Sequence, residues 1–161
     1  MFVRKYILLF LILLIFFLMP LQIFIIGDYS GIGVQGAAYR YQTSSYGTSM
    51  ILITQELMYI VNGIYSGKTA LSIILWALGT ILFTCTMAYS FIRVTEDDDG
   101  FYRQIMFGLV GSCLIYLMSC IAQYGILFHG PAGISLPAGI VGMLFWIAFI
   151  LKYPSISRQF Q

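Results

Sequence analysis

The feature that most constrains this fold is a series of apolar runs about as long as a lipid bilayer is thick. The first, from Tyr6 to Ile26, consists almost entirely of Leu, Ile and Phe. A hydrocarbon core of about 30 Å needs roughly 20 apolar residues in helical form. We expect this run to be a retained membrane span, because the apolar core of a cleavable signal peptide is only about 7 to 15 residues long.

The composition agrees with a membrane protein and leaves no room for a separate soluble domain. The chain has 161 residues, of which 60% are hydrophobic and 9% charged, whereas about one quarter of an ordinary soluble domain is charged. We predict an all-α membrane fold, a four-transmembrane-helix bundle with a small extracytoplasmic β-sheet formed by the first loop. Residues 1–161 would be one domain with spans at about 6–26, 69–92, 105–128 and 136–153 and an extracytoplasmic loop at 27–68.

The distribution of Lys and Arg predicts the orientation. Basic residues gather on the cytoplasmic side of membrane proteins. The expected cytoplasmic segments carry six of them, whereas the first loop and the third connection carry two, Arg40 and Lys68. The six are Arg4, Lys5, Arg93, Arg103, Lys152 and Arg158. We therefore expect a multi-pass protein of the plasma or cytoplasmic membrane with both termini in the cytoplasm.

The loop from Gly27 to Lys68 is the one long segment outside the expected spans. Its stretches 34–42 and 48–61 are rich in β-branched and aromatic residues, which favour strands. Asn62-Gly63 between apolar residues is a strong signal for a two-residue hairpin turn. We predict a small antiparallel sheet here, with an amphipathic or buried helix over 50–61 as the alternative, since short apolar runs do not separate the two states.

The same loop holds the candidate partner-binding residues. Tyrosine and arginine are enriched at protein interfaces, and Arg40 stands between two tyrosines. Tyrosines also pack at the membrane surface, so a structural role is the alternative. The candidates are Tyr39, Arg40, Tyr41, Tyr46, Tyr59 and Tyr65.

Small and hydroxyl residues recur along one face of each of the later spans. Such stripes let two helices approach closely within a membrane. We predict helix packing at Ser72, Gly79, Thr86, Gly108, Ser112, Ser119, Gln123, Gly139 and Gly142.

The sequence argues against chemistry and against nucleic acid as a partner. The expected spans contain no acidic residue, and His129 is the only histidine, so neither a catalytic triad nor a multi-histidine metal site is expected. The segment 63–69 lacks the spacing of a phosphate-binding loop. A net charge of +2 provides no basic field for nucleic acid, and the loop has no cysteine for a disulfide. We predict no enzyme activity, no cofactor and no metal.

The expected layout resembles the claudin and peripheral myelin protein type of tetraspan proteins. It rests on a large first outer loop with strands running into the second span, and on cytoplasmic ends. The loop lacks the Trp, the Gly-Leu-Trp and the cysteine pair of that family, since Trp76 and Trp146 lie in the expected spans. No functional residue is carried over. The resemblance implies a left-handed helix bundle topped by a small sheet, a scaffold for lateral assembly.

These features lead to a hypothesis of function by association. Its partners would be the lipid bilayer and other membrane proteins or copies of itself, as a structural protein or an accessory subunit. The alternative is a small passive channel or solute facilitator, lined by Thr80, Thr84, Ser112, Ser119 and Gln123.

Overall fold

The computed structural model describes residues 2–27, 30–93, 99–130, 132–146 and 148. Four helices and six strands have the following bounds: α1 Phe2–Leu18, β1 Gln22–Ile26, β2 Gly31–Gln35, β3 Tyr39–Ser44, β4 Gly47–Leu52, α2 Ile53–Val61, α3 Gly67–Ile92, α4 Asp99–Tyr124, β5 His129–Gly130 and β6 Gly133–Leu136. A further helical stretch covers 138–146.

The predicted four-helix tetraspan bundle is wrong. Among the described residues, only α3 and the 103–124 part of α4 are long and apolar enough to cross a membrane. The apolar run 6–26 divides into α1 and β1 instead of forming one helix. Pro20 explains the break, because proline cannot donate the helical hydrogen bond and disfavours helix at the residue before it.

Two more expected spans are shifted in the structure. The span predicted at 105–128 begins earlier and ends at Tyr124, where Gly125 takes a φ of 84°, a left-handed conformation that glycine adopts without strain. The span predicted at 136–153 begins with a strand residue, Leu136, and its helix follows at 138. Residues 149–153 of that prediction lie outside the described part of the chain. The span predicted at 69–92 corresponds closely to α3.

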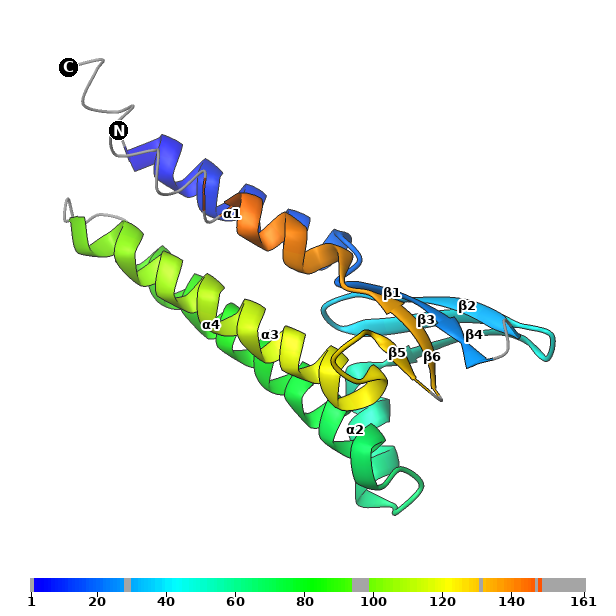
Figure 1. The fold of residues 1–161 in the computed structure, drawn as a ribbon. Helices are drawn as coiled ribbons and strands as arrows, with labels where there is room; N and C mark the ends of the chain where they lie inside the picture. Colours follow the sequence, from blue (N-terminus) through cyan, green and yellow to red (C-terminus); the bar gives the residue numbers. More distant parts are fainter. Residues whose placement is uncertain (1, 28–29, 94–98, 131, 147, 149–161) are drawn as a thin grey trace.

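The sheet is larger than the loop that was expected to form it. It has six antiparallel strands in the order β4-β3-β2-β1-β6-β5. Three of these come from outside residues 27–68: β1 from the first apolar run, and β5 and β6 from the third connection. The first and third connections therefore fold together (Figure 1).

The predicted Asn62-Gly63 hairpin is also wrong, and the helix alternative describes this segment better. Residues 53–61 form α2, Asn62 ends it, and Gly63 takes a φ of 72° in the turn that follows. A positive φ suits both a hairpin and a helix end. From α2, the buried carboxylate of Glu56 faces Arg40 of the sheet. This tertiary contact cannot be read from the residues of the segment alone.

The helices extend away from the sheet as two packed layers (Figure 1). In one layer α1 lies beside the 138–146 helix, where Gly142 faces Met19 closely. In the other, α3 lies beside α4. Phe16 of α1 stacks on Phe83 of α3 with ring centroids 3.5 Å apart, and both side chains belong to the main apolar core.

Candidate functional site: the junction of sheet and helices

The cross-strand register divides the sheet into two chemically different faces. Residues directly opposite each other on neighbouring strands share a face. On the face against the helices, the inner face, the register aligns Gln22 with Gln35 and Gln35 with Arg40, and these three side chains are buried. Ser135 lies on the same face beside Phe24. An antiparallel sheet usually buries its apolar face and exposes its polar one, so this sheet is inverted.

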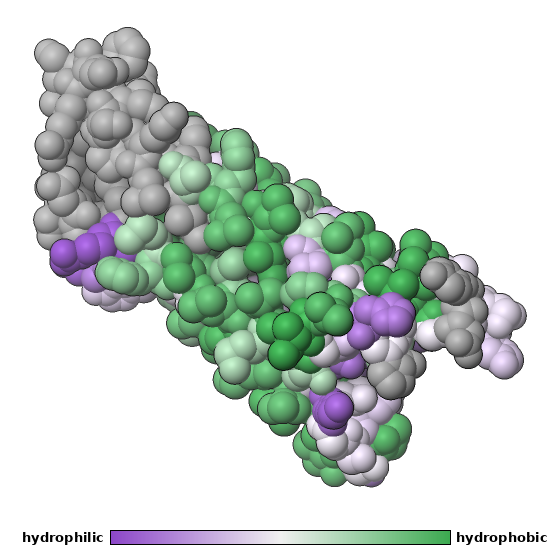
Figure 2. All heavy atoms as spheres, viewed as in Figure 1, coloured by the Kyte–Doolittle hydropathy of each residue, from purple (hydrophilic) through white to green (hydrophobic). Residues whose placement is uncertain are grey.

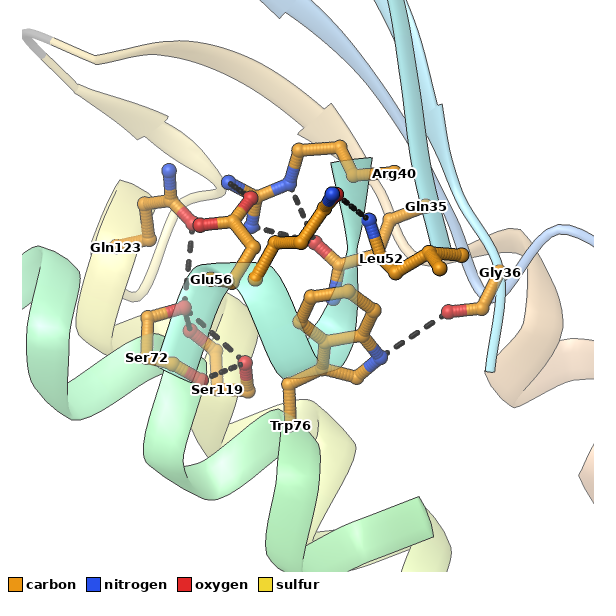
Figure 3. A network of polar contacts seen from close by, with 10 residues as sticks. Gln35, Gly36, Arg40, Leu52, Glu56, Ser72, Trp76, Ser119 and Gln123 are labelled. Atoms are coloured by element: carbon orange, nitrogen blue, oxygen red, sulfur yellow. Dashed lines mark hydrogen bonds and ion pairs between the residues drawn. The ribbon is translucent and has the colours of Figure 1, made fainter. Parts of the chain in front are cut away.

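The centre of the inner face is the guanidinium of Arg40. It donates to Oε1 of Gln35 from Nη2 at 2.9 Å and from Nε at 3.3 Å. Its Nη1 lies 3.0 Å from Oε1 of Glu56, and its Cζ lies over the rings of Trp76 and Phe24 at 5.5 and 5.8 Å from their centroids. Figure 3 shows the sheet and α2 both reaching into this network. The positive charge is thus matched by one carboxylate and two aromatic faces.

Glu56 is fully buried, and Arg40 is its one described ionic partner. Nη1 of Arg40 lies close to the carboxylate, but its N–H groups are not directed well enough to form a hydrogen bond to either carboxylate oxygen. Burial raises the pKa of Glu56 above its ordinary value, and the charge of Arg40 opposes that rise less strongly. Upstream, Gln55 caps α2 by accepting a bond from the backbone N–H of Leu52 at 3.0 Å.

Two side chains of α3 fasten the sheet to the helices. Nε1 of Trp76 donates to the carbonyl of Gly36 at 3.0 Å, and Oγ1 of Thr80 donates to the carbonyl of Ala37 at 2.7 Å. Thr80 also lies 2.7 Å from the hydroxyl of Tyr116 on α4. The Gly36–Ala37 turn between β2 and β3 is therefore held directly on the helices, and all its bonded groups are buried or half-buried.

The predicted helix-packing residues of α3 and α4 fall into close contact. Oγ of Ser72 bonds to the backbone carbonyl of Ser119 at 2.9 Å and lies 3.1 Å from Oε1 of Gln123. Gly108 lies directly against the side chain of Thr86 and leaves no room for a Cβ. Three of the remaining four face other residues closely: Gly79 faces Tyr116, Gly139 faces Leu21 and Gly142 faces Met19. The fourth, Ser112, is fully buried, and its hydroxyl bonds within α4 to the carbonyl of Gly108.

The predicted partner-binding residues of the loop do not form one cluster. Tyr46 is 97% exposed at the turn between β3 and β4, and Tyr41 is 44% exposed on the outer face. Tyr59 and Tyr65 are half-buried and pack edge to face, 5.6 Å apart. Burial, with the nearby carboxylate of Glu56, raises the pKa of Tyr65. Tyr39 is half-buried, and Arg40 points inward, so it lies in the network and not on the surface.

The outer face of the sheet carries the apolar side chains. One register row aligns Leu136, Ile23, Val34, Tyr41 and Met50, and the next aligns Ile134, Ile25, Ile32, Thr43 and Thr48. On β5 the second row continues with His129, which lies opposite Ile134, and neither row contains Asp, Glu, Lys or Arg. Leu136, Met50 and Ile32 are 62%, 61% and 54% exposed.

Sequence reasoning missed two members of the network around Arg40, which are Gln35 on the inner face and Glu56 on α2. Gln35 stands alone among small and apolar residues in 31–38, and Glu56 is the one acid in the stretch 50–61. A lone acid or amide within an apolar run has to find a buried partner, and this signal was available for Glu56 in the stretch 50–61. The partners themselves come from distant parts of the chain.

Within the described residues, no three His, Cys, Asp or Glu side chains gather closely enough to hold a metal ion. Cys113 and Cys120 are buried, and the thiol of Cys120 donates to Oε1 of Gln22 at 3.1 Å. No protein-family model matches the chain, and no curated protein or solved structure shows significant similarity to it.

Proposed function

We propose that this chain is a non-enzymatic, multi-pass integral membrane protein that acts by lateral association. It would join copies of itself or serve as an accessory subunit of a larger membrane complex. The observation that carries this proposal is β4, an edge strand of six residues with neither a charge nor a proline. Exposed edges of this kind pair with other chains unless the protein blocks them.

The exposed surface of the helices supports the membrane location. Only 39% of the apolar window in α3 and 44% of that in α4 is buried. The large apolar side chains that face outward include Leu71, Leu78, Ile81, Phe107 and Leu114. A soluble core helix would be mostly buried, whereas a membrane helix turns such residues to lipid. Figure 2 shows a nearly continuous hydrophobic surface over the helices.

The rigidity of the sheet supports a role in contact. The turn at Gly36 and Ala37 is bonded to α3, and Arg40 joins the sheet to α2 through Glu56. A platform fixed in this way presents the β4 edge and Tyr46 in one orientation, which lowers the entropic cost of binding. The partner would be a membrane protein that meets the β4 edge at the same level, and the lipid itself would be the surrounding medium.

The orientation and the resemblance form part of this proposal. The basic residues favour cytoplasmic termini and a sheet on the opposite side of the membrane. The resemblance to the claudin type concerns a sheet anchored on membrane helices. We do not propose the passive channel, because Thr80, Ser119 and Gln123 bond to partners within the chain.

The association is tested by mass measurement after extraction in a mild detergent. We expect an assembly larger than one chain, and we expect Thr48→Lys, which puts a charge on the exposed edge strand, to shift it towards single chains. Ile64→Lys is the matched control, since Ile64 is 62% exposed but lies between α2 and α3. A wild-type protein that is a single chain without a bound partner would refute the proposal, as would equal effects of the two variants.

A further inference from the structure

The apolar outer face of the sheet needs a cover, and the lengths of the neighbouring elements indicate which one. The apolar part of α1, Tyr6–Leu18, has 13 residues. At 1.5 Å per residue it spans only about 20 Å, whereas the hydrocarbon core is about 30 Å thick. The next apolar segment along the chain is β1, which begins at Gln22.

The exposed apolar side chains of α3 indicate which length of this helix lies in the hydrocarbon core of the bilayer. They extend from Leu71 to Ile92, a distance of about 32 Å along a helix. The sheet meets α3 inside this stretch, because Trp76 and Thr80 hold the carbonyls of Gly36 and Ala37. These contacts lie about 8 to 14 Å along the axis from Leu71. The end of the sheet next to that turn is therefore level with helix surface that is apolar and exposed.

If the helix end of the sheet lies in the hydrocarbon core, the outer face should be more apolar there than at the far end of the strands. On β3 and β4 the outer-face residues nearest the turn are Tyr39 and Leu52, and the first row that crosses β6, β1, β2, β3 and β4 contains Leu136, Ile23, Val34, Tyr41 and Met50. The next row ends in Thr43 and Thr48, and beyond it the β3–β4 turn contains Ser44, Ser45 and Tyr46. On β3 and β4, apolar residues thus lie next to the helices and polar residues at the far end, whereas on β1, β2 and β6 the second row is still apolar, with Ile25, Ile32 and Ile134.

Several backbone groups at this end have partners within the chain, and the remaining edge of β4 is the one proposed above to pair with a partner. Irregular backbone at membrane depth is tolerated only where protein satisfies its polar groups. The carbonyls of Gly36 and Ala37 are bonded to α3, and the N–H groups of Leu52 and Ile53 at the end of the edge strand are bonded to Gln55 and Ala38. A polar inner face with an apolar outer face is the pattern of a β-structure whose outside contacts lipid.

We propose that the outer face at the helix end of the sheet, with Leu136, Val34 and Met50, is immersed in the hydrocarbon of the bilayer. The cover of this face is lipid, and β1 completes the apolar length that α1 lacks. This inference rests on the proposed membrane location of α3 and α4. It makes the sheet an extension of the helix bundle within the membrane instead of a cap above it.

Nitroxide accessibility tests the inference in nanodiscs of phosphatidylcholine that hold one full-length chain each. The background is Cys85→Ala, which removes the one cysteine that is exposed. Single labels enter through Leu136→Cys and Met50→Cys near the helices, Tyr46→Cys at the far turn, and Leu114→Cys on the exposed side of α4. The ratio of collisions with oxygen, which concentrates in lipid, to collisions with a water-soluble nickel chelate reports immersion.

We expect the ratio at residues 136 and 50 to resemble that at 114 and to exceed that at 46 several-fold. Ratios at 136 and 50 that match residue 46, while 114 remains immersed, would overturn this inference and leave the membrane location intact. A low ratio at 114 as well would refute the membrane location itself. A label at 136 that neither reagent reaches would mean that protein covers the face, and this result would also overturn the inference.

Discussion

The two faces of the sheet differ in what they contact and in how much they contribute to folding. The inner face carries Gln22, Gln35 and Arg40, all buried, whereas the outer face carries Ile32, Met50 and Leu136, all more than half exposed. In water the opposite distribution would be stable, because exposed apolar area is costly and buried polar groups lose their hydration. The inversion is stable only if the inner groups satisfy one another and an apolar medium or partner meets the outer ones.

In this sheet the polar side chains of the inner face lie in the interior, and the apolar ones of the outer face lie on the surface. Arg40 is bonded to Gln35, paired with Glu56 and stacked over Trp76, so a change on this face leaves a partner without its match. The apolar outer-face side chains Ile32, Met50 and Leu136 have no polar atom, so a change there removes no side-chain hydrogen bond. The two faces should therefore respond very differently to substitution.

The largest effect is expected from breaking the charge pair. Arg40→Met leaves the fully buried carboxylate of Glu56 without its cation, and removal of one partner of a buried pair costs about 3–5 kcal/mol. The free energy of unfolding in micelles measures it. The double variant Arg40→Met with Glu56→Leu should recover much of the loss. If the double variant is as unstable as the sum of the single ones, the pair is not the reason for the loss.

A smaller effect is expected where the sheet meets α3. Trp76→Phe keeps an aromatic ring but leaves the buried carbonyl of Gly36 without its donor, which costs about 1–3 kcal/mol. Thermal unfolding in the same micelles is the measurement. Tyr46→Phe, which removes a hydroxyl from a fully accessible side chain, serves as the control. Equal melting temperatures for the two variants would show that this bond does not hold the sheet.

The pH dependence of stability tests whether burial or the charge of Arg40 has the larger effect on the pKa of Glu56. Burial raises its pKa above the ordinary 4.5 and outweighs the attraction of Arg40. The folded chain then keeps this proton at pH values where the unfolded chain has lost it. The resulting stability is fully present below pH 4.5 and disappears as the pH rises through the folded pKa. Melting temperatures of wild type minus Glu56→Gln should thus fall with pH, and a difference that rises would mean that the ion pair dominates.

The smallest effect is expected on the outer face. Ile32→Thr keeps a β-branched side chain at a position 54% exposed, and surface changes of this kind stay within about 0.5 kcal/mol. Unfolding in micelles measures it, with the similarly conservative Val34→Thr as a half-buried comparison. A loss as large as that from Trp76→Phe would mean that the outer face packs against protein within the chain, and the contrast between the faces would fail.

The local sequence pattern was sufficient to predict some helices and strands and insufficient to predict others. The long apolar run that became α3 was predicted at almost its full length, and the stripe residues Ser72, Ser119 and Gln123 are in mutual contact in the structure. The first run was misread because hydrophobicity alone cannot separate a span from a helix followed by a strand. Its division at Pro20 depends on β2 and β6, which pair with β1 from either side.

The sequence by itself determined that this chain carries long apolar helices and a strand-rich connection. These properties follow from composition and spacing within short windows. Only the tertiary structure decided that two connections far apart in sequence share one sheet, and that Arg40 faces inward to Glu56. The physical reason is that the elements packed against a strand decide which of its two sides faces inward. The partner of a buried charge likewise depends on which residues the fold brings near it.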